Sequence, residues 1–285
     1  MPPYRTGVAA DPEWMTRFVR LAERLGFESV YLVEHVVVPV DYGSRYPYSD
    51  TGKMPLADDC PIPDPLDLAA FLLARTERLV LGTGIVIALH QHPLVLAKRA
   101  ASLDVLSGGR FRLGVGVGWM REELESTGVD WDSRGAVLDE HLDAMCAIWS
   151  QDPVTFEGEH YRFTDVRSYP RPIRASGIPL HIGGHAPAAA RRAGRIADGF
   201  QPLGLDDDLI AARWGLVQRT AEEHGRDPAS IEFTLGAPVQ RVDLETVHRR
   251  AAQGATRLLL STATAEFDKL EDELGEVAQR LELSR

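Results

Sequence analysis

Glu34 and His35 form the first pair of residues whose types suggest chemistry. They stand in VEHVVVP (33–39), and the apolar run SVYLV just before them predicts a buried strand. At the end of a barrel strand, a carboxylate beside an imidazole can steer proton transfer to or from a substrate. The alternative is a structural pair whose hydrogen bonds are satisfied within the fold, and the two residues alone do not decide between these interpretations.

Three glycines alternate with valine in the second candidate stretch, GVGVGW. On a strand, Gly114, Gly116 and Gly118 point to the same face, so three absent side chains clear a groove. Glycine within a strand costs stability, and close approach by a ligand is one reason to keep it. A crowded interior that needs small residues is the other. The stretch does not match the dinucleotide motif G-x-G-x-x-G, because Trp119 replaces the third glycine.

The stretch HIGGHAP (181–187) joins an apolar strand to a helix. Gly183, Gly184 and His185 stand in the turn, and Pro187 opens the helix. Glycines before a helix N-terminus expose unpaired amides, and the helix dipole favours an anion there, so the turn is a candidate phosphate site. An ordinary strand-to-helix turn with proline at the first helical position is the alternative.

Two histidines follow a further glycine-containing strand end, LGTGIV (81–86), which includes Thr83 and Gly84. His90 and His92 could bind a metal ion as a pair. No acidic or cysteine residue is spaced to complete such a site, so the sequence predicts no metal centre.

Three acidic residues, Glu122, Glu123 and Glu125, gather around a helix start after GVGVGW. Acidic side chains at this place are usually explained by their favourable interaction with the helix dipole. The sequence therefore assigns them no chemical role.

Composition excludes several classes of function. The formal net charge of −11 argues against broad binding of nucleic acid or anionic membranes. No apolar run is long enough for a transmembrane helix, and the N-terminus lacks the features of a signal peptide. Cys60 and Cys146 lie far apart and suggest no disulfide framework. We therefore expect a cytoplasmic protein.

The candidate residues need a scaffold, and the chain alternates apolar strands with segments of helical spacing. Repeated β–α units of this kind predict a parallel sheet covered by helices. With YRTGVAA (4–10) as a weak first strand there are about eight units, which favours a (β/α)8 barrel in a single domain spanning residues 1–285. An open doubly wound sheet is the alternative. Strands are expected at 29–33, 78–89, 110–118, 178–184, 198–203, 231–238 and 257–261, and helices at 13–26, 65–75, 93–109, 133–149, 187–197, 206–224, 243–253 and beyond 261.

Two segments are too long for plain connections in a compact domain. Residues 34–64 contain Tyr42, Tyr46 and Tyr48, and in a barrel they would lie on the catalytic face because they follow a strand. Residues 151–177 are also rich in aromatic side chains and suit a hairpin. We expect residues 40–48, which contain the three tyrosines, to act as a lid that excludes water.

Taken together, these stretches resemble the bacterial luciferase-like superfamily, and within it the branch that uses the deazaflavin coenzyme F420. The long block around GVGVGW and the block around GGHAP are specific, whereas the C-terminal third matches only in pattern. The matching stretches are AERLGFESVYLVEH (22–35), LVLGTGIVI (79–87), HPLVLAKRAASLDVLSGGRFRLGVGVGW (92–119) and IPLHIGGHAPAAARRAGRIADGF (178–200).

The resemblance implies a barrel whose C-terminal mouth holds the deazaflavin ring, with its side chain running to a phosphate site. His35 matches a histidine near the reactive ring edge. Gly116 and Gly118 would leave room for the ring and ribityl chain, and Gly84–Ile85 matches the place of a non-prolyl cis peptide bond. The cofactor-binding residues implied in this way are Thr83, Gly84, Ile85, Gly116, Gly118, Trp119, Gly183, Gly184 and His185.

Some positions depart from the pattern of this branch. Glu34 stands where deazaflavin relatives commonly have Asp, which shifts the expected hydrogen bond at the ring edge. Trp119 stands where sugar-phosphate dehydrogenases of the branch have a catalytic Glu, which counts against such a substrate. Part of the usual first strand is also missing.

The function that the resemblance implies is hydride transfer between the deazaflavin and a small organic substrate. His35 would donate or accept the proton, and Glu34 would orient His35 or the ring. An FMNH2-dependent monooxygenase on the same barrel is the main alternative, since FMN has the same ring-to-phosphate layout. A non-catalytic flavin-binding protein of this fold is a third. A homodimer is expected from the resemblance alone.

Overall fold

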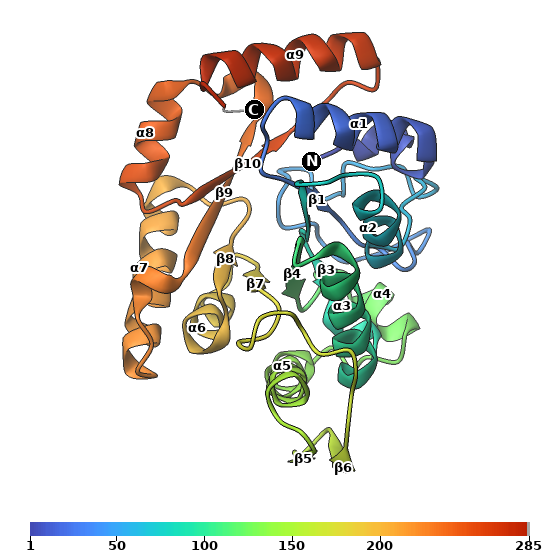
Figure 1. The fold of residues 1–285 in the computed structure, drawn as a ribbon, viewed down its shortest axis with the longest axis vertical. Helices are drawn as coiled ribbons and strands as arrows, with labels where there is room; N and C mark the ends of the chain where they lie inside the picture. The colour runs from blue at the N-terminus through green and yellow to red at the C-terminus, as the bar shows by residue number, and fades with distance from the viewer. Residues whose placement is uncertain (284–285) are drawn as a thin grey trace.

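The computed structural model describes residues 1–283, and within them eight parallel strands form a nearly closed barrel surrounded by helices (Figure 1). The hydrogen-bonded order is β1-β2-β4-β7-β8-β9-β10, and β3 pairs with β4 beside this path. The strands of the barrel are Ser29–Leu32 (β1), Val80–Thr83 (β2), Val86–Ile87 (β3), Phe111–Gly116 (β4), Leu180–Gly183 (β7), Gly199–Gln201 (β8), Glu232–Pro238 (β9) and Arg257–Ser261 (β10).

Helices follow the strands along the chain and cover the outside of the barrel. Four of them, α1, α2, α3 and α6, begin at a proline, whose fixed φ suits the first helical position. Within residues 1–283 none combines the length and apolar character needed to cross a membrane. The helices are Pro12–Arg24 (α1), Pro65–Leu73 (α2), Pro93–Ser107 (α3), Arg121–Ser126 (α4), Arg134–Ser150 (α5), Pro187–Ile196 (α6), Asp207–Glu223 (α7), Leu244–Ala252 (α8) and Phe267–Arg280 (α9).

The strand expected at residues 4–10 does not form. Two short 3-10 helices, Tyr4–Thr6 and Val8–Ala10, occupy this stretch instead. Gly7 between them has a φ of 75°, a left-handed conformation that breaks an extended chain and that glycine adopts without steric cost. The hydroxyl of Tyr4 accepts a hydrogen bond from the backbone N–H of Val33 at 3.0 Å, so the turn packs against the end of β1. The prediction of a strand at this place was wrong.

A seam therefore separates the two end strands of the sheet, β1 and β10, which do not pair with each other within residues 1–283. At one end of the seam, the amino group of Met1 donates to the carbonyl of Leu260 at 2.6 Å, and the carbonyl of Met1 accepts from the N–H of Thr262. Towards the other end, Arg257 of β10 contacts Glu28, which directly precedes β1, at 2.8 Å. Polar contacts thus connect the edges where a ladder of backbone hydrogen bonds is missing.

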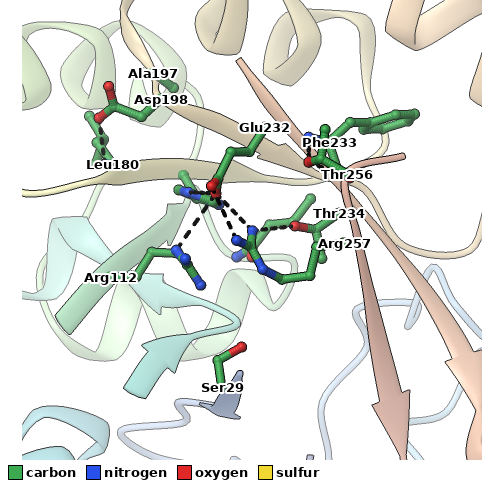
Figure 2. Close-up of polar contacts among 12 residues, drawn as sticks. Ser29, Arg112, Leu180, Ala197, Asp198, Glu232, Phe233, Thr234, Thr256 and Arg257 are labelled. Atoms are coloured by element: carbon green, nitrogen blue, oxygen red, sulfur yellow. Dashed lines mark hydrogen bonds and ion pairs between the residues drawn. The ribbon is translucent and has the colours of Figure 1, made fainter. Parts of the chain in front are cut away.

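Charged side chains line the interior at the N-terminal ends of the strands (Figure 2). Glu232 lies 2.7 Å from Arg257 and 3.7 Å from Arg112. The contact with His181 at 3.1 Å, and then the hydrogen bonds of Arg257, hold the pKa of Glu232 well below its usual range. This end of a barrel contributes to stability rather than to catalysis, so the candidate site is sought at the opposite end.

The segment 151–177 contains an antiparallel hairpin, as its pattern suggested. Val154–Glu157 (β5) pairs with Arg162–Val166 (β6) outside the barrel. The carboxylate of Glu140 on α5 accepts backbone N–H bonds from residues 159–161 at the turn. The hairpin is therefore held against α5.

Candidate active site

His35 follows β1 at the C-terminal end of the barrel and meets a carboxylate that the sequence did not pair with it. Its Nδ1 lies 2.8 Å from Oε2 of Glu123, and the two side chains are 9% and 1% exposed. Oε1 of Glu123 accepts the backbone N–H of Val36 at 2.7 Å. Glu123 belongs to α4, 88 residues further along the chain, and no local pattern indicates its contact with His35.

Glu122, the neighbour of Glu123, contacts the start of the lid. Its Oε1 accepts the backbone N–H groups of Gly43 at 2.7 Å and Ser44 at 3.0 Å. Hydrogen bonding to Ser44 is the main reason that the pKa of Glu122 is lowered to about 2. The two acids, interpreted from the sequence as partners of the helix dipole, thus bind the loop that follows β1.

Glu34, which was expected to orient His35 or the ring, directs its hydrogen bond to another segment, and the carboxylate next to His35 is Glu123. The side chain of Glu34 is buried, and its Oε2 accepts the backbone N–H of Ile87 at 2.5 Å. Burial raises the pKa of Glu34 to about 8, and the nearby carboxylates of Asp64 and Glu123 act in the same direction. Glu34 is therefore mainly a neutral acid near pH 7, and it contacts the strand β3 that follows Gly84–Ile85.

The strand expected at 78–89 is divided in two. The Gly84–Ile85 peptide bond is cis, as the resemblance implied, and it separates β2 from β3. The hydroxyl of Thr83 donates to the carbonyl of Gly114 at 2.7 Å and accepts its N–H at 2.8 Å. The side chain of Gln201 donates to the carbonyl of Thr83 at 3.0 Å. Side chains therefore replace backbone pairing between β2 and β4 at this point.

The side chain of Ile85 occupies the space that side chains at Gly116 and Gly183 would need. A Cβ at Gly116 would come within 2.5 Å of Cδ1 of Ile85, and a Cβ at Gly183 would overlap its Cγ2. Gly114 is equally crowded, by the carbonyl of Thr83. For these glycines the interior needs small residues because neighbouring protein atoms fill the space.

Gly118 has a φ of 78°, a left-handed conformation that favours glycine. Its nearest neighbours are side chains of Ile87 and Leu124, at 3.3 and 3.4 Å from a Cβ placed there. Gly118 thus turns the chain from β4 towards α4 and brings Glu122 and Glu123 to the loop after β1.

Trp119 lies at the centre of an aromatic group above His35. Its ring is edge-to-face with His35, Tyr42 and Tyr46, with centroid distances of 6.1, 5.7 and 5.0 Å. Such pairs are favourable beyond their buried area. The lid therefore packs onto the residue that follows the glycine strand.

The lid also reaches the glycine turn after β7. The hydroxyl of Tyr48 lies 3.3 Å from Nδ1 of His185, and Tyr46 packs edge-to-face on Tyr48 at 5.2 Å. Gly184 has a φ of 122°, and the guanidinium of Arg213 donates to the carbonyl of His185 at 2.8 Å. Burial and then the charge of Arg213 lower the pKa of His185. Tyr48 thus connects the His35 end of the mouth to the predicted phosphate turn.

His90 and His92 do not act as a pair. His90 bonds to Thr127 at 2.7 Å and lies 3.9 Å from Glu123, whereas the ring of His92 packs on Tyr161. Burial lowers the pKa of His90. No group of three or more His, Cys, Asp or Glu side chains in the described part of the chain is placed to hold a metal ion.

Comparison with known proteins decides the family. The family model of luciferase-like monooxygenases matches residues 3–282. The chain belongs to this family. An F420-dependent glucose-6-phosphate dehydrogenase of Nakamurella multipartita is 35% identical over 267 residues, which cover 88% of this chain and 71% of the relative. An uncharacterised protein of Mycobacterium tuberculosis is 34% identical over 207 residues, with 73% and 71% covered.

Solved structures of other proteins share the fold. An F420-dependent secondary alcohol dehydrogenase in complex with an F420-acetone adduct has a TM-score of 0.78 at 18% identity, with 97% of this chain and 96% of that chain covered. The long-chain alkane monooxygenase LadA has a TM-score of 0.73 at 14% identity, with 96% and 85% covered. These likenesses confirm the predicted luciferase-like barrel.

Proposed function

We propose that this protein is a coenzyme F420-dependent oxidoreductase that transfers a hydride between the deazaflavin and a small organic substrate at the C-terminal mouth of the barrel. Two of the relatives more than 30% identical are F420-dependent glucose-6-phosphate dehydrogenases. The observation that carries the proposal is the arrangement of one mouth. Trp119, Tyr46 and Tyr48 link His35 to His185 in the glycine turn before α6, and Ile85 lies against Gly183 of that turn.

The residues present fit a deazaflavin. The side chain of Ile85 rests on Gly116 and Gly183, so the backbone of Ile85 would face the ring. The turn at 183–185 leads into α6, whose N-cap residue Ala186 makes no side-chain cap hydrogen bond. Pro187 has no N–H and the N–H of Ala189 bonds to the carbonyl of Ala186, so among the first three helical positions the amide of Ala188 would face a phosphate. When bound, the deazaflavin would supply the hydride acceptor or donor.

Each element of the mouth then has a role. His35 would take a proton from the substrate or return it. The turn at 183–185 would bind the phosphate and thereby set the position of the cofactor. Tyr42, Tyr46 and Tyr48 would exclude water from the reacting groups, because they cover the mouth between His35 and His185.

Parallel titrations of the purified protein with coenzyme F420 and with FMN, followed by fluorescence, test the cofactor. Tight binding of F420 alone supports the proposal, and binding of neither refutes it. In the F420-loaded enzyme, His35→Ala should lower turnover by roughly 100-fold or more while the affinity for the cofactor changes little. Equal turnover would remove His35 from the mechanism.

An FMNH2-dependent monooxygenase is the second candidate, and the name of the matching family favours it. Tight binding of FMN alone, together with a product that forms only in the presence of O2, would establish it. Cofactor binding without turnover on any of a panel of substrates would instead support a flavin-binding protein. We further propose a homodimer, which light scattering of the purified protein would test.

A further inference from the structure

Glu123 is a buried acid whose hydrogen bonds all involve the segment that carries His35. Its side chain is 1% exposed. A buried carboxylate is costly unless hydrogen bonds compensate for the lost water. Oε1 accepts the N–H of Val36 at 2.7 Å and approaches that of Val37 at 3.5 Å, while Oε2 lies 2.8 Å from Nδ1 of His35. The acid is thus oriented by the backbone next to the histidine.

This geometry determines which nitrogen of His35 carries the hydrogen. With Oε1 occupied by a backbone donor, Oε2 remains as an acceptor and faces Nδ1. An acceptor opposite Nδ1 requires the hydrogen to lie on Nδ1, so the neutral ring keeps a free lone pair on Nε2. A carboxylate that orients a catalytic histidine in this way also stabilises the imidazolium when the ring takes a second proton.

The other titratable groups near Glu123 do not compete for this role. His90 Nε2 is 3.9 Å away, beyond hydrogen-bond distance, and burial lowers the pKa of His90. Glu34 directs its Oε2 to the backbone N–H of Ile87 instead. Of these three groups, His35 is the one within hydrogen-bond distance of Glu123.

We propose that Glu123 is the positioning residue for His35: it holds the ring as the tautomer with hydrogen on Nδ1, so that Nε2 is the atom that accepts a proton from a substrate hydroxyl. This inference rests on the proposed function for the identity of the reaction, but the tautomer is a property of the protein alone. The hydroxyl proton moves to Nε2, and the positive charge that forms on the ring lies against Glu123.

Glu123→Gln is the informative variant. Its amide oxygen can still accept the N–H of Val36, and this bond turns the amide NH2 towards His35. The NH2 then donates to Nδ1 and forces the hydrogen to Nε2, which is the wrong tautomer for accepting a proton. Glu125→Gln is the matched control, because Glu125 lies on the same helix, is exposed and contacts Arg121 instead.

The first measurement is the tautomer in cofactor-free protein, by nitrogen NMR of 15N-histidine-labelled samples, with the His35 signal assigned from its loss in His35→Gln. We expect hydrogen on Nδ1 in the wild type and Glu125→Gln, and on Nε2 in Glu123→Gln. A wild-type ring with hydrogen on Nε2 would overturn the proposal, even if Glu123→Gln fails to fold. An unchanged tautomer in a folded Glu123→Gln would do the same.

The second measurement uses the F420-loaded enzyme. Glu123→Gln should lower kcat by about 100-fold to 10,000-fold, the contribution of a general acid–base group, with less than about a threefold change in cofactor affinity. Unchanged kcat would refute the positioning role. If the wild type fails to bind F420, the proposed function falls, while the tautomer measurement still decides the role of Glu123.

Discussion

The contact of Ile85 with two glycines makes Gly116→Ala a sharp test of how the mouth is built. The new Cβ would stand 2.5 Å from Cδ1 of Ile85, against about 3.5–4.0 Å for an ordinary carbon–carbon contact. The end of the Ile85 side chain must therefore retreat by roughly 1 Å or more. Its Cγ2 already fills the space over Gly183, so the side chain cannot retreat in that direction.

The expected loss of stability depends on which atom the new Cβ meets. Cδ1 is the flexible end of a side chain, so the fold should survive, with a loss of roughly 1–3 kcal/mol in the free energy of unfolding. If the displaced Ile85 enters the space of the cofactor, a similar energy is lost from binding, which corresponds to roughly 5-fold to 150-fold weaker affinity for F420.

The assay is a double-mutant cycle with Ile85→Ala, read out by urea unfolding and by F420 titration. Because Ile85→Ala removes the atoms that clash, Gly116→Ala should cost little in that background, with a coupling energy of about 1–3 kcal/mol. Gly275→Ala is the control, because a Cβ at this position of α9 meets nothing within 4 Å. Additive effects of the two substitutions would refute the reasoning.

Three further predictions follow from other contacts. The pKa of Glu34 is raised from 4.5 to about 8 in the folded protein, so the stability that its protonated form contributes is complete below pH 4.5 and is lost as the pH rises through 8. In Glu34→Gln, the free energy of unfolding measured by urea titration should therefore change less between pH 4.5 and 8 than it does in the wild type. An equal pH dependence in the two proteins would contradict this. Glu122→Ala should release the lid, seen as at least roughly tenfold faster hydrogen exchange at Gly43 and Ser44, whereas unchanged protection would show that the bonds of Glu122 are unimportant. Arg257→Ala leaves Arg112 as the shared partner of Glu28 and Glu232 and should lower the free energy of unfolding by about 1–3 kcal/mol; a loss below about 0.5 kcal/mol would mean that the partly exposed pairs are screened by water.

The sequence predicted the order of the elements and the end of the barrel that holds the site. Apolar runs and helical spacing located the strands and helices within a few residues, and GVGVGW and HIGGHAP marked two strand ends. These features depend on neighbours in the chain, because a strand, a turn or a helix start is specified by residues within a few positions. The first strand was the exception, since Gly7 turns that stretch into short 3-10 helices.

Only the tertiary structure decided which side chains meet. Glu123 contacts His35 across 88 positions, and Ile85 lies on Gly116 and Gly183, which belong to two different strands. A contact of this kind depends on how neighbouring strands are paired and how the loops above them turn. The sequence alone indicated that Glu123 interacts with the helix dipole and that Gly116 leaves room for a ligand. In the folded barrel, Glu123 contacts His35 and Gly116 contacts the side chain of Ile85.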